Sequence, residues 1–162
     1  MKQYKVAILG ATGAVGCEMM KILAERDFPV AELHLLASER SVGQLLPWKG
    51  QDIAVELACD EAFKGMDIVL GAAENDIAKR FAPAIVKAGA VFVDNSSAFR
   101  MDPNVPLVIP EINPEDARKH KGIIANPNCT TIQMVVALKA IEQLSHIKTC
   151  LLYTSPSPRD RT

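Results

Sequence analysis

The feature that most constrains the fold is a glycine-rich turn between an apolar segment and an amphipathic segment near the start of the chain. Residues 6–9 read Val-Ala-Ile-Leu, which predicts a buried strand, and Gly-Ala-Thr-Gly-Ala-Val-Gly follows at 10–16. The residues after the turn have helical periodicity, with one apolar face formed by Val15, Met19, Ile22 and Leu23.

A strand, a glycine turn and a helix in this order are the setting of a dinucleotide-binding site. Glycines let the backbone approach a pyrophosphate, and the N-terminus of the helix stabilises its charge. The spacing here is G-x-x-G-x-x-G, which differs from the G-x-G-x-x-G fingerprint. A tight turn with packing glycines is therefore the alternative interpretation.

Apolar strands alternate with helical segments along the rest of the chain, which predicts an α/β fold with a Rossmann-like, doubly wound and mostly parallel sheet. Further strands are expected at residues 32–37, 66–73, 91–95, 107–109 and 123–127, with a hairpin-like insertion at 44–58. Ligands bind at the carboxyl ends of the strands in such folds. We therefore expect the segments that follow the strands to converge: 10–16, 38–43, 72–74, 95–100 and 126–129.

Three later helices are expected. The first carries apolar residues at helical spacing from Ile77 to a C-cap at Gly89, and Pro83 should kink or interrupt it. A short helix should open at Asn113, which we expect to act as its N-cap because proline and acids follow. The third should begin near Cys129, after an apolar strand that stops at Pro127.

Cys129 is a candidate nucleophile because it lies at or beside the N-terminus of that third helix. Unpaired N–H groups and the helix dipole favour an anion there, and the thiolate is the nucleophilic form of cysteine. The Asn-Pro-Asn turn at 126–128 would present the side chain at the edge of the sheet. The alternative is a buried structural cysteine, which is the commonest role of a free cysteine.

The end of the second strand indicates which nicotinamide cofactor is bound. A site that prefers NAD usually carries an acid there for the ribose hydroxyls. This chain has Ser-Glu-Arg-Ser-Val-Gly at 38–43, where Ser38, Arg40 and Ser41 could hold the 2′-phosphate of NADP. We therefore predict NADP, although Glu39 is an opposing observation and a solvated Arg40 is the alternative.

Composition excludes several classes of function for this chain of 162 residues, which is long enough for one domain or slightly more. The net charge is −1 without a basic stripe, so neither nucleic acid nor an anionic membrane is expected as a partner. The start of the chain has no signal-peptide pattern and no apolar run could span a bilayer, so we expect a cytoplasmic protein. The four cysteines lack Cys-x-x-Cys spacing and the three histidines lack a motif, so no metal site is expected.

Taken together, these residues resemble the aspartate-semialdehyde dehydrogenase family. The similarity runs from Lys5 to about Lys148. It is carried by GATGAVG at 10–16, SERSVG at 38–43, VDNSSAFRMDPNVPLVIPEINPE at 93–115 and IIANPNCTTIQMVVAL at 123–138.

The resemblance implies a role for each matching residue. Cys129 would be the acyl-forming nucleophile, Arg100 would contact phosphate or the acyl phosphate, and Asn128 would lie beside them. The cofactor would be NADP, and the residues expected to bind it are Gly10, Thr12, Gly13, Ala14, Val15, Gly16, Ser38, Arg40, Ser41 and Asn95. No metal is implied.

The implied reaction interconverts L-aspartate 4-semialdehyde, phosphate and NADP⁺ with 4-aspartyl phosphate and NADPH through a cysteine thioester. It belongs to the biosynthesis of lysine, methionine and threonine, and family members are homo-oligomers. N-acetyl-gamma-glutamyl-phosphate reductase is a related alternative, but its turn should read Asn-Pro-Gly-Cys-Tyr, and Asn128 and Thr130 differ from it. A non-catalytic NADP-binding fragment or regulatory paralog is the alternative from another class.

The chain departs from the family near its end. Residues 1–148 are expected to form the dinucleotide-binding domain, and residues 149–162, rich in Ser, Pro and Arg, read as a disordered and non-native tail. The family's second domain, for substrate binding and dimerisation, has no counterpart in this sequence. Its catalytic histidine and substrate-binding arginine are absent with it, so we expect little or no turnover from this chain alone.

Overall fold

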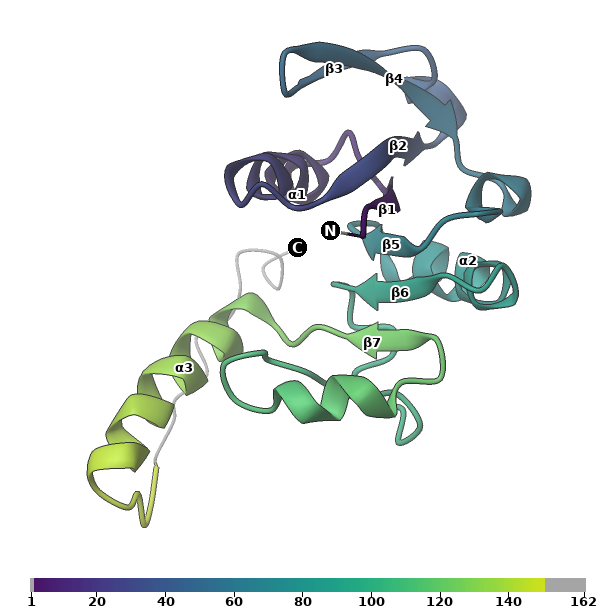
Figure 1. Ribbon diagram of the computed structural model, residues 1–162. Helices are drawn as coiled ribbons and strands as arrows, with labels where there is room; N and C mark the ends of the chain where they lie inside the picture. Colours follow the sequence, from purple (N-terminus) through teal and green to yellow (C-terminus); the bar gives the residue numbers. More distant parts are fainter. Residues whose placement is uncertain (1, 151–162) are drawn as a thin grey trace, which may run out of the picture.

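A seven-stranded sheet forms the centre of the computed structural model, which describes residues 2–150 (Figure 1). Its strand order is β3-β4-β2-β1-β5-β6-β7. The strands are β1 (Tyr4–Leu9), β2 (Val30–Ala37), β3 (Leu45–Trp48), β4 (Gln51–Leu57), β5 (Ile68–Gly71), β6 (Val91–Asp94) and β7 (Ile123–Ala125). All neighbouring pairs are parallel except β3 with β4. The predicted fold class is therefore confirmed. From residue 151 onward, the tail predicted at 149–162 lies outside the described residues.

The central strand β1 is buried on both faces, which explains its unbroken apolar sequence. Side chains alternate across a strand, so Val6 and Ile8 pack in one cluster and Ala7 and Leu9 in the other. The first cluster includes Met20 of helix α1 (Ala14–Glu25), and the second includes residues of helix α2 (Asn75–Lys87). The two helices therefore cover opposite faces of the sheet, as a doubly wound fold requires.

Helix α2 continues through Pro83, so the predicted interruption at this proline is wrong. A proline inside a helix costs about 3 kcal/mol, because it lacks an N–H donor and its ring crowds the preceding turn. The same helix buries Phe81 and Ile85 in the core, and each such side chain contributes about 1.5–3 kcal/mol. Burial of this face offsets the cost of the proline, whose own side chain is exposed.

Of two predictions for residues 107–119, the strand is wrong, and the short helix is confirmed except for the expected side-chain cap. The apolar triplet at 107–109 forms no strand, and only Leu107 makes an isolated parallel bridge, to Ala125 of β7. Residues Pro114–Lys119 form a 3₁₀ helix, η3, without a side-chain cap from Asn113. Instead, the Asn113 side chain accepts a hydrogen bond from the Ile109 N–H at 2.9 Å and donates to the Leu107 carbonyl at 3.0 Å. The Asn113 side chain therefore closes the loop at 107–113, because the N–H and carbonyl groups of that loop lie within hydrogen-bond distance of it.

The predicted hairpin at 44–58 is confirmed, but it belongs to the main sheet. Strands β3 and β4 pair antiparallel, and β4 continues the sheet beside β2. The indole N–H of Trp48 donates to the carbonyl of Met20 at 3.0 Å, which ties the hairpin to α1. Two short 3₁₀ helices, η1 (Glu39–Ser41) and η2 (Asp60–Phe63), follow β2 and β4.

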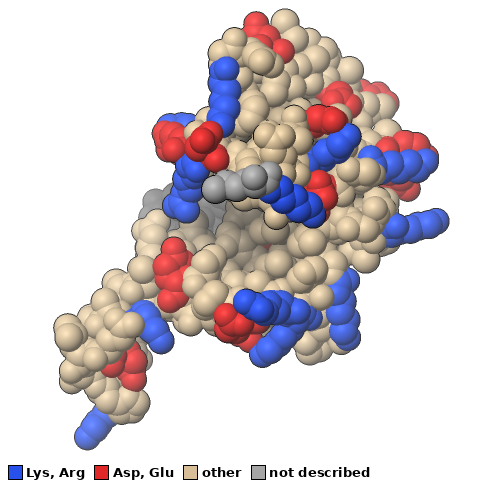
Figure 2. All heavy atoms as spheres, in the orientation of Figure 1, with Lys and Arg blue, Asp and Glu red and all other residues tan. Residues whose placement is uncertain are grey.

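Helix α3 (Cys129–Leu144) begins at the predicted residue and projects from the rest of the domain (Figure 1). None of its residues is buried, and Leu144 near its end is 90% exposed. Figure 2 shows this helix at the lower left with few charged side chains along it, whereas both signs of charge are mixed over the remaining surface in view. The domain therefore presents one apolar helix that its own core does not cover.

Candidate functional site

The carboxyl ends of adjacent parallel strands lie along one edge of the sheet, and the expected convergence of the segments that follow them is confirmed. In the order β2-β1-β5-β6-β7, these segments start at Ser38, Gly10, Ala72, Asn95 and Asn126. Neighbouring strands are about 4.8 Å apart, so the row from β2 to β7 is about 19 Å wide. An extended ligand such as a dinucleotide could therefore contact loops at both ends of this row.

The glycine turn after β1 is tight because two of its glycines have no room for a side chain. Gly10 has a φ of +88°, and a Cβ there would lie 2.9 Å from the backbone of Ala72. A Cβ on Gly16 would lie 2.4 Å from the carbonyl oxygen of Gly10. The start of α1 therefore packs directly against the end of β1. The same glycines leave the backbone of the turn without side chains that would keep a ligand away.

The N-terminus of α1 is open to an anion. Its N-cap, Gly13, provides no side-chain hydrogen bond, and the first turn holds no acid. Gly13, Ala14 and Val15 are exposed, while Gly16 is buried. The first N–H groups of a helix have no partner within it, so this turn has the donors that a pyrophosphate requires.

The segment after β2 adjoins the glycine turn. The hydroxyl of Thr12 donates to the Ser41 hydroxyl at 3.5 Å, which brings the two predicted cofactor-binding segments together. Ser38 and Arg40 are exposed on and beside η1. Within residues 2–150, Arg40 and Glu39 form no ion pair, so the guanidinium group is available to a phosphate, and Glu39 does not neutralise it directly.

Arg100, Asn95 and Asn126 join the segments after β6 and β7. The Arg100 guanidinium donates through Nε to the carbonyl of Asn126 and through Nη2 to the carbonyl of Asn95, both at 2.9 Å. The Asn126 amide donates to Oδ1 of Asn95 at 2.6 Å. Arg100 is thus held by two backbone carbonyls, and its remaining N–H groups can bind an anion.

Cys129 is exposed at the first residue of α3, so the buried-cysteine alternative is wrong. Oδ1 of Asn128 accepts a hydrogen bond from the Thr130 N–H at 2.9 Å, which makes Asn128 the N-cap of this helix. The cap fixes the start of α3, so Cys129 belongs to the turn whose first N–H groups have no partner within the helix.

Three residues at or beside these turns had no role assigned to them from the sequence: Asn126, Asp94 and Ser96. Asn126 precedes Pro127 in the turn before Cys129, and Asp94 is an acid at the end of an apolar strand. Both positions could have drawn attention, because a polar residue at the end of a buried strand needs a partner. Ser96 gave no such signal.

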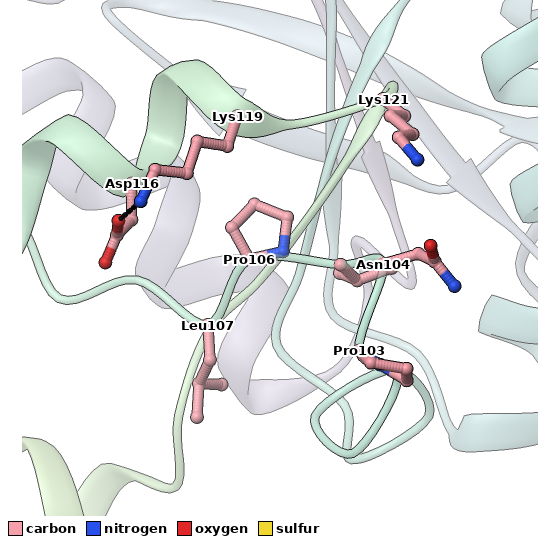
Figure 3. A pocket seen from close by; sticks show the side chains of 8 residues that line it. Pro103, Asn104, Pro106, Leu107, Asp116, Lys119 and Lys121 are labelled. Atoms are coloured by element: carbon pink, nitrogen blue, oxygen red, sulfur yellow. Dashed lines mark hydrogen bonds and ion pairs between the residues drawn. The ribbon is translucent and has the colours of Figure 1, made fainter.

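Two cavities lie away from the residues predicted for this edge. One, of about 330 Å³, lies between the loop at 103–107 and η3, where Lys119 pairs with Asp116 and Lys121 lines another side (Figure 3). Hydrogen bonds from Lys119 and Asn113 lower the pKa of the Asp116 carboxyl. The other, of about 380 Å³, lies between α1 and the β3–β4 hairpin. Neither is lined by a predicted site residue, so the candidate site is an open edge.

Within residues 2–150, no cluster of three or more His, Cys, Asp or Glu side chains could hold a metal ion. None of the helices in the same range has the length and apolar character needed to cross a membrane.

Comparison with known proteins gives consistent matches. The model of the family described as semialdehyde dehydrogenase, NAD binding domain, matches residues 5–120. The chain is 58% identical to the aspartate-semialdehyde dehydrogenase of Synechocystis over 153 residues, which cover 94% of this chain and 45% of that protein.

Solved structures of aspartate semialdehyde dehydrogenases are also similar to this chain. The crystal structure of aspartate semialdehyde dehydrogenase II from Vibrio cholerae complexed with ASA has a TM-score of 0.82 at 48% identity, over 88% of this chain and 47% of that chain. Aspartate semialdehyde dehydrogenase from Candida albicans, solved with NADP, has a TM-score of 0.69 at 27% identity, over 90% of this chain and 48% of that chain. The chain therefore spans somewhat less than half the length of these relatives.

Proposed function

Because the chain belongs to the family of semialdehyde dehydrogenase NAD-binding domains, we propose that it is the part of an aspartate-semialdehyde dehydrogenase that binds NADP and carries the nucleophile. The observation that carries the proposal is one edge of the sheet. There the open N-terminus of α1 and the exposed Cys129 at the start of α3 follow strands of the same parallel row. The reaction interconverts L-aspartate 4-semialdehyde, phosphate and NADP⁺ with 4-aspartyl phosphate and NADPH.

The residues of this chain would act in sequence. The Cys129 thiolate attacks the aldehyde carbon, and the N–H groups of the first turn of α3 stabilise the anion beforehand. The adduct on Cys129 then loses the hydride of the former aldehyde carbon, for which NADP⁺, held at the glycine turn and at Arg40, would supply the acceptor when it is bound. Cys129 then carries a thioester, which phosphate cleaves to release the thiolate. Arg100 would orient that phosphate with the N–H groups that its two carbonyl contacts leave free.

The proposed function is tested by phosphate-dependent NADPH formation. We define the extended protein as residues 1–148 of this chain joined to the C-terminal remainder of the Synechocystis relative. With aspartate semialdehyde, it should form NADPH only when phosphate and Cys129 are both present. A preference for N-acetylglutamate semialdehyde would favour the related reductase, and NADPH binding without any turnover would favour a binding module. Either result would contradict the proposal.

Arg40→Ala is expected to weaken binding of NADPH by this chain about 10- to 100-fold, while binding of NADH changes less than about threefold. The expectation follows from loss of a charge-assisted contact to the 2′-phosphate, which contributes about 1.5–3 kcal/mol. Titration of both cofactors by fluorescence measures the two dissociation constants. Glu39→Ala is the matched control, because it removes the neighbouring acid and should not weaken NADPH binding. Equal losses for both cofactors in Arg40→Ala would show that Arg40 does not recognise the 2′-phosphate.

A further inference from the structure

Asp94 is the one fully buried polar or charged residue among the described side chains. It ends β6, opposite Gly71 of β5, and a Cβ on Gly71 would lie 3.0 Å from its carboxyl oxygen. Burial of a carboxyl group is costly unless hydrogen bonds satisfy its oxygens. The partners of Asp94 are therefore informative, because β6 lies between β5 and β7 in the row of strands that carries the candidate site.

The carboxyl group of Asp94 holds the turn that follows it. Its Oδ1 accepts a hydrogen bond from the Ser96 N–H at 3.1 Å, and its Oδ2 accepts one from the Ser96 hydroxyl at 2.6 Å. The Ser96 hydroxyl oxygen in turn accepts a hydrogen bond from the Ala98 N–H at 3.1 Å. The buried carboxyl group thus restrains the start of the turn at 95–98 through Ser96, while Asn75 binds the N–H of Ser97 from outside the turn.

Residues 94–100 hydrogen-bond to three groups of Asn126, which follows the neighbouring strand β7: its N–H, its side chain and its carbonyl. The N–H of Asn126 donates to the Asp94 carbonyl at 2.8 Å, and its side chain donates to Asn95. The carbonyl of Asn126 accepts from Arg100, which is also bonded to Asn95. Strand β7 has only three residues, and its last residue, Ala125, is also hydrogen-bonded on its other side to Pro106 and Val108. The contacts from residues 94–100 are the ones that reach Asn126 itself.

We infer that Asp94 is a positioning residue for the nucleophile: through Ser96 and Asn126, its buried carboxyl group fixes the turn that presents Cys129 at the start of α3. This inference rests on the proposed role of Cys129. Asn126 lies three residues before Cys129, and the intervening Pro127 has a fixed φ, so the restraint on Asn126 passes along a stiff segment. When the turn loosens, the sulfur spends less time beside the N–H groups that stabilise its thiolate.

The test is the alkylation rate of Cys129 by iodoacetamide at pH 7.5, measured on this chain by peptide mass spectrometry. Cys150 serves as the reference thiol, because it is exposed and lies beyond the end of α3. Ser96→Ala should lower the ratio of the Cys129 rate to the Cys150 rate about fivefold. Ser96→Thr keeps the hydroxyl and should restore the ratio to within about twofold of the original.

Ser97→Ala is the matched control. Ser97 is the adjacent serine, but its hydroxyl pairs with Asn75 rather than with Asp94, so its loss should leave the ratio unchanged. Asp94→Ala should lower the ratio at least as much as Ser96→Ala. The double variant should lower it no further than Asp94→Ala alone, because both residues act in one network. Ser96→Ala keeps the buried acid, so the test does not depend on the folding of Asp94→Ala.

Two failures can be told apart. If Cys129 of the unmodified chain reacts no faster than Cys17 and Cys59, the assignment of the nucleophile is wrong, and the inference is overturned with it. If Cys129 reacts faster than both but Ser96→Ala leaves the ratio unchanged or raises it, only the positioning role is overturned. Failure of Ser96→Thr to restore a lowered ratio would also overturn it, because the hydroxyl would then not be the cause.

Discussion

Cys129→Ser is expected to lower the rate of NADPH formation by the extended protein about 1,000-fold or more. Serine is close to cysteine in size and can occupy the same exposed position at the start of α3. Its hydroxyl ionises far less readily than a thiol, however, so the anionic form that attacks the aldehyde is scarce near neutral pH. Removal of a covalent nucleophile commonly costs several orders of magnitude in kcat. Initial rates with saturating semialdehyde, phosphate and NADP⁺ measure the effect.

The control for this substitution is Cys59→Ser. Cys59 is half-buried before η2 and is not among the proposed site residues, so its replacement should leave the rate within about twofold. NADPH binding should persist in both variants, which separates a chemical defect from a loss of the cofactor site. A Cys129→Ser rate above one tenth of the original would contradict a thioester mechanism at this residue.

Gly16→Ala is expected to destabilise this chain by at least about 3 kcal/mol and to abolish measurable NADPH binding. The new methyl group would lie 2.4 Å from the Gly10 carbonyl oxygen and 2.7 Å from the Ala11 Cα. Both atoms are backbone, so the overlap can be relieved only by moving α1 away from β1. Overpacking of a rigid site typically costs 1–3 kcal/mol and occasionally more. Urea unfolding and NADPH titration measure the two effects.

Gly13→Ala provides the matched comparison within the same turn. A Cβ on Gly13 would lie 3.5 Å from the Gly10 carbonyl oxygen, which is an ordinary contact, and the φ of −78° suits any residue. Its cost should be about 1 kcal/mol or less, because alanine is only a poorer N-cap than glycine. Equal destabilisation by the two substitutions would mean that close approach of α1 to the turn is not what requires Gly16.

The parts of the fold that depend on local patterns could be predicted from the sequence. The apolar run at 6–9 and the glycine turn specify β1, its connection and α1, because each pattern favours one backbone conformation. The triplet at 107–109 misled because apolar character indicates burial and not strand pairing: Val108 and Ile109 are buried, but only Leu107 bridges β7. Pro83 misled because the local cost of a proline is outweighed by packing that its neighbours make elsewhere.

The candidate site also has a part that could be predicted from the sequence and a part that could not. Its loops could be placed together because the carboxyl ends of parallel strands share an edge. The restraints on Asn126 could not be predicted, since Arg100 and Asn95 lie 26 and 31 residues before it in the sequence. Such contacts depend on the register of β6 with β7, which no local pattern specifies. Candidate ligand-binding residues were therefore easier to nominate than the residues that hold them in place.

The central claim is that the glycine turn and Cys129 belong to one site, and protection of Cys129 by NADPH tests it most directly. With this chain alone, saturating NADPH should slow alkylation of Cys129 about tenfold. The Cys150 rate should not change, because Cys150 lies beyond the far end of α3, a helix about 24 Å long, and Cys129 is at its start. Protection should follow the same dissociation constant as the fluorescence titration and should be lost in Gly16→Ala. Saturable NADPH binding with an unchanged Cys129 rate would contradict the account.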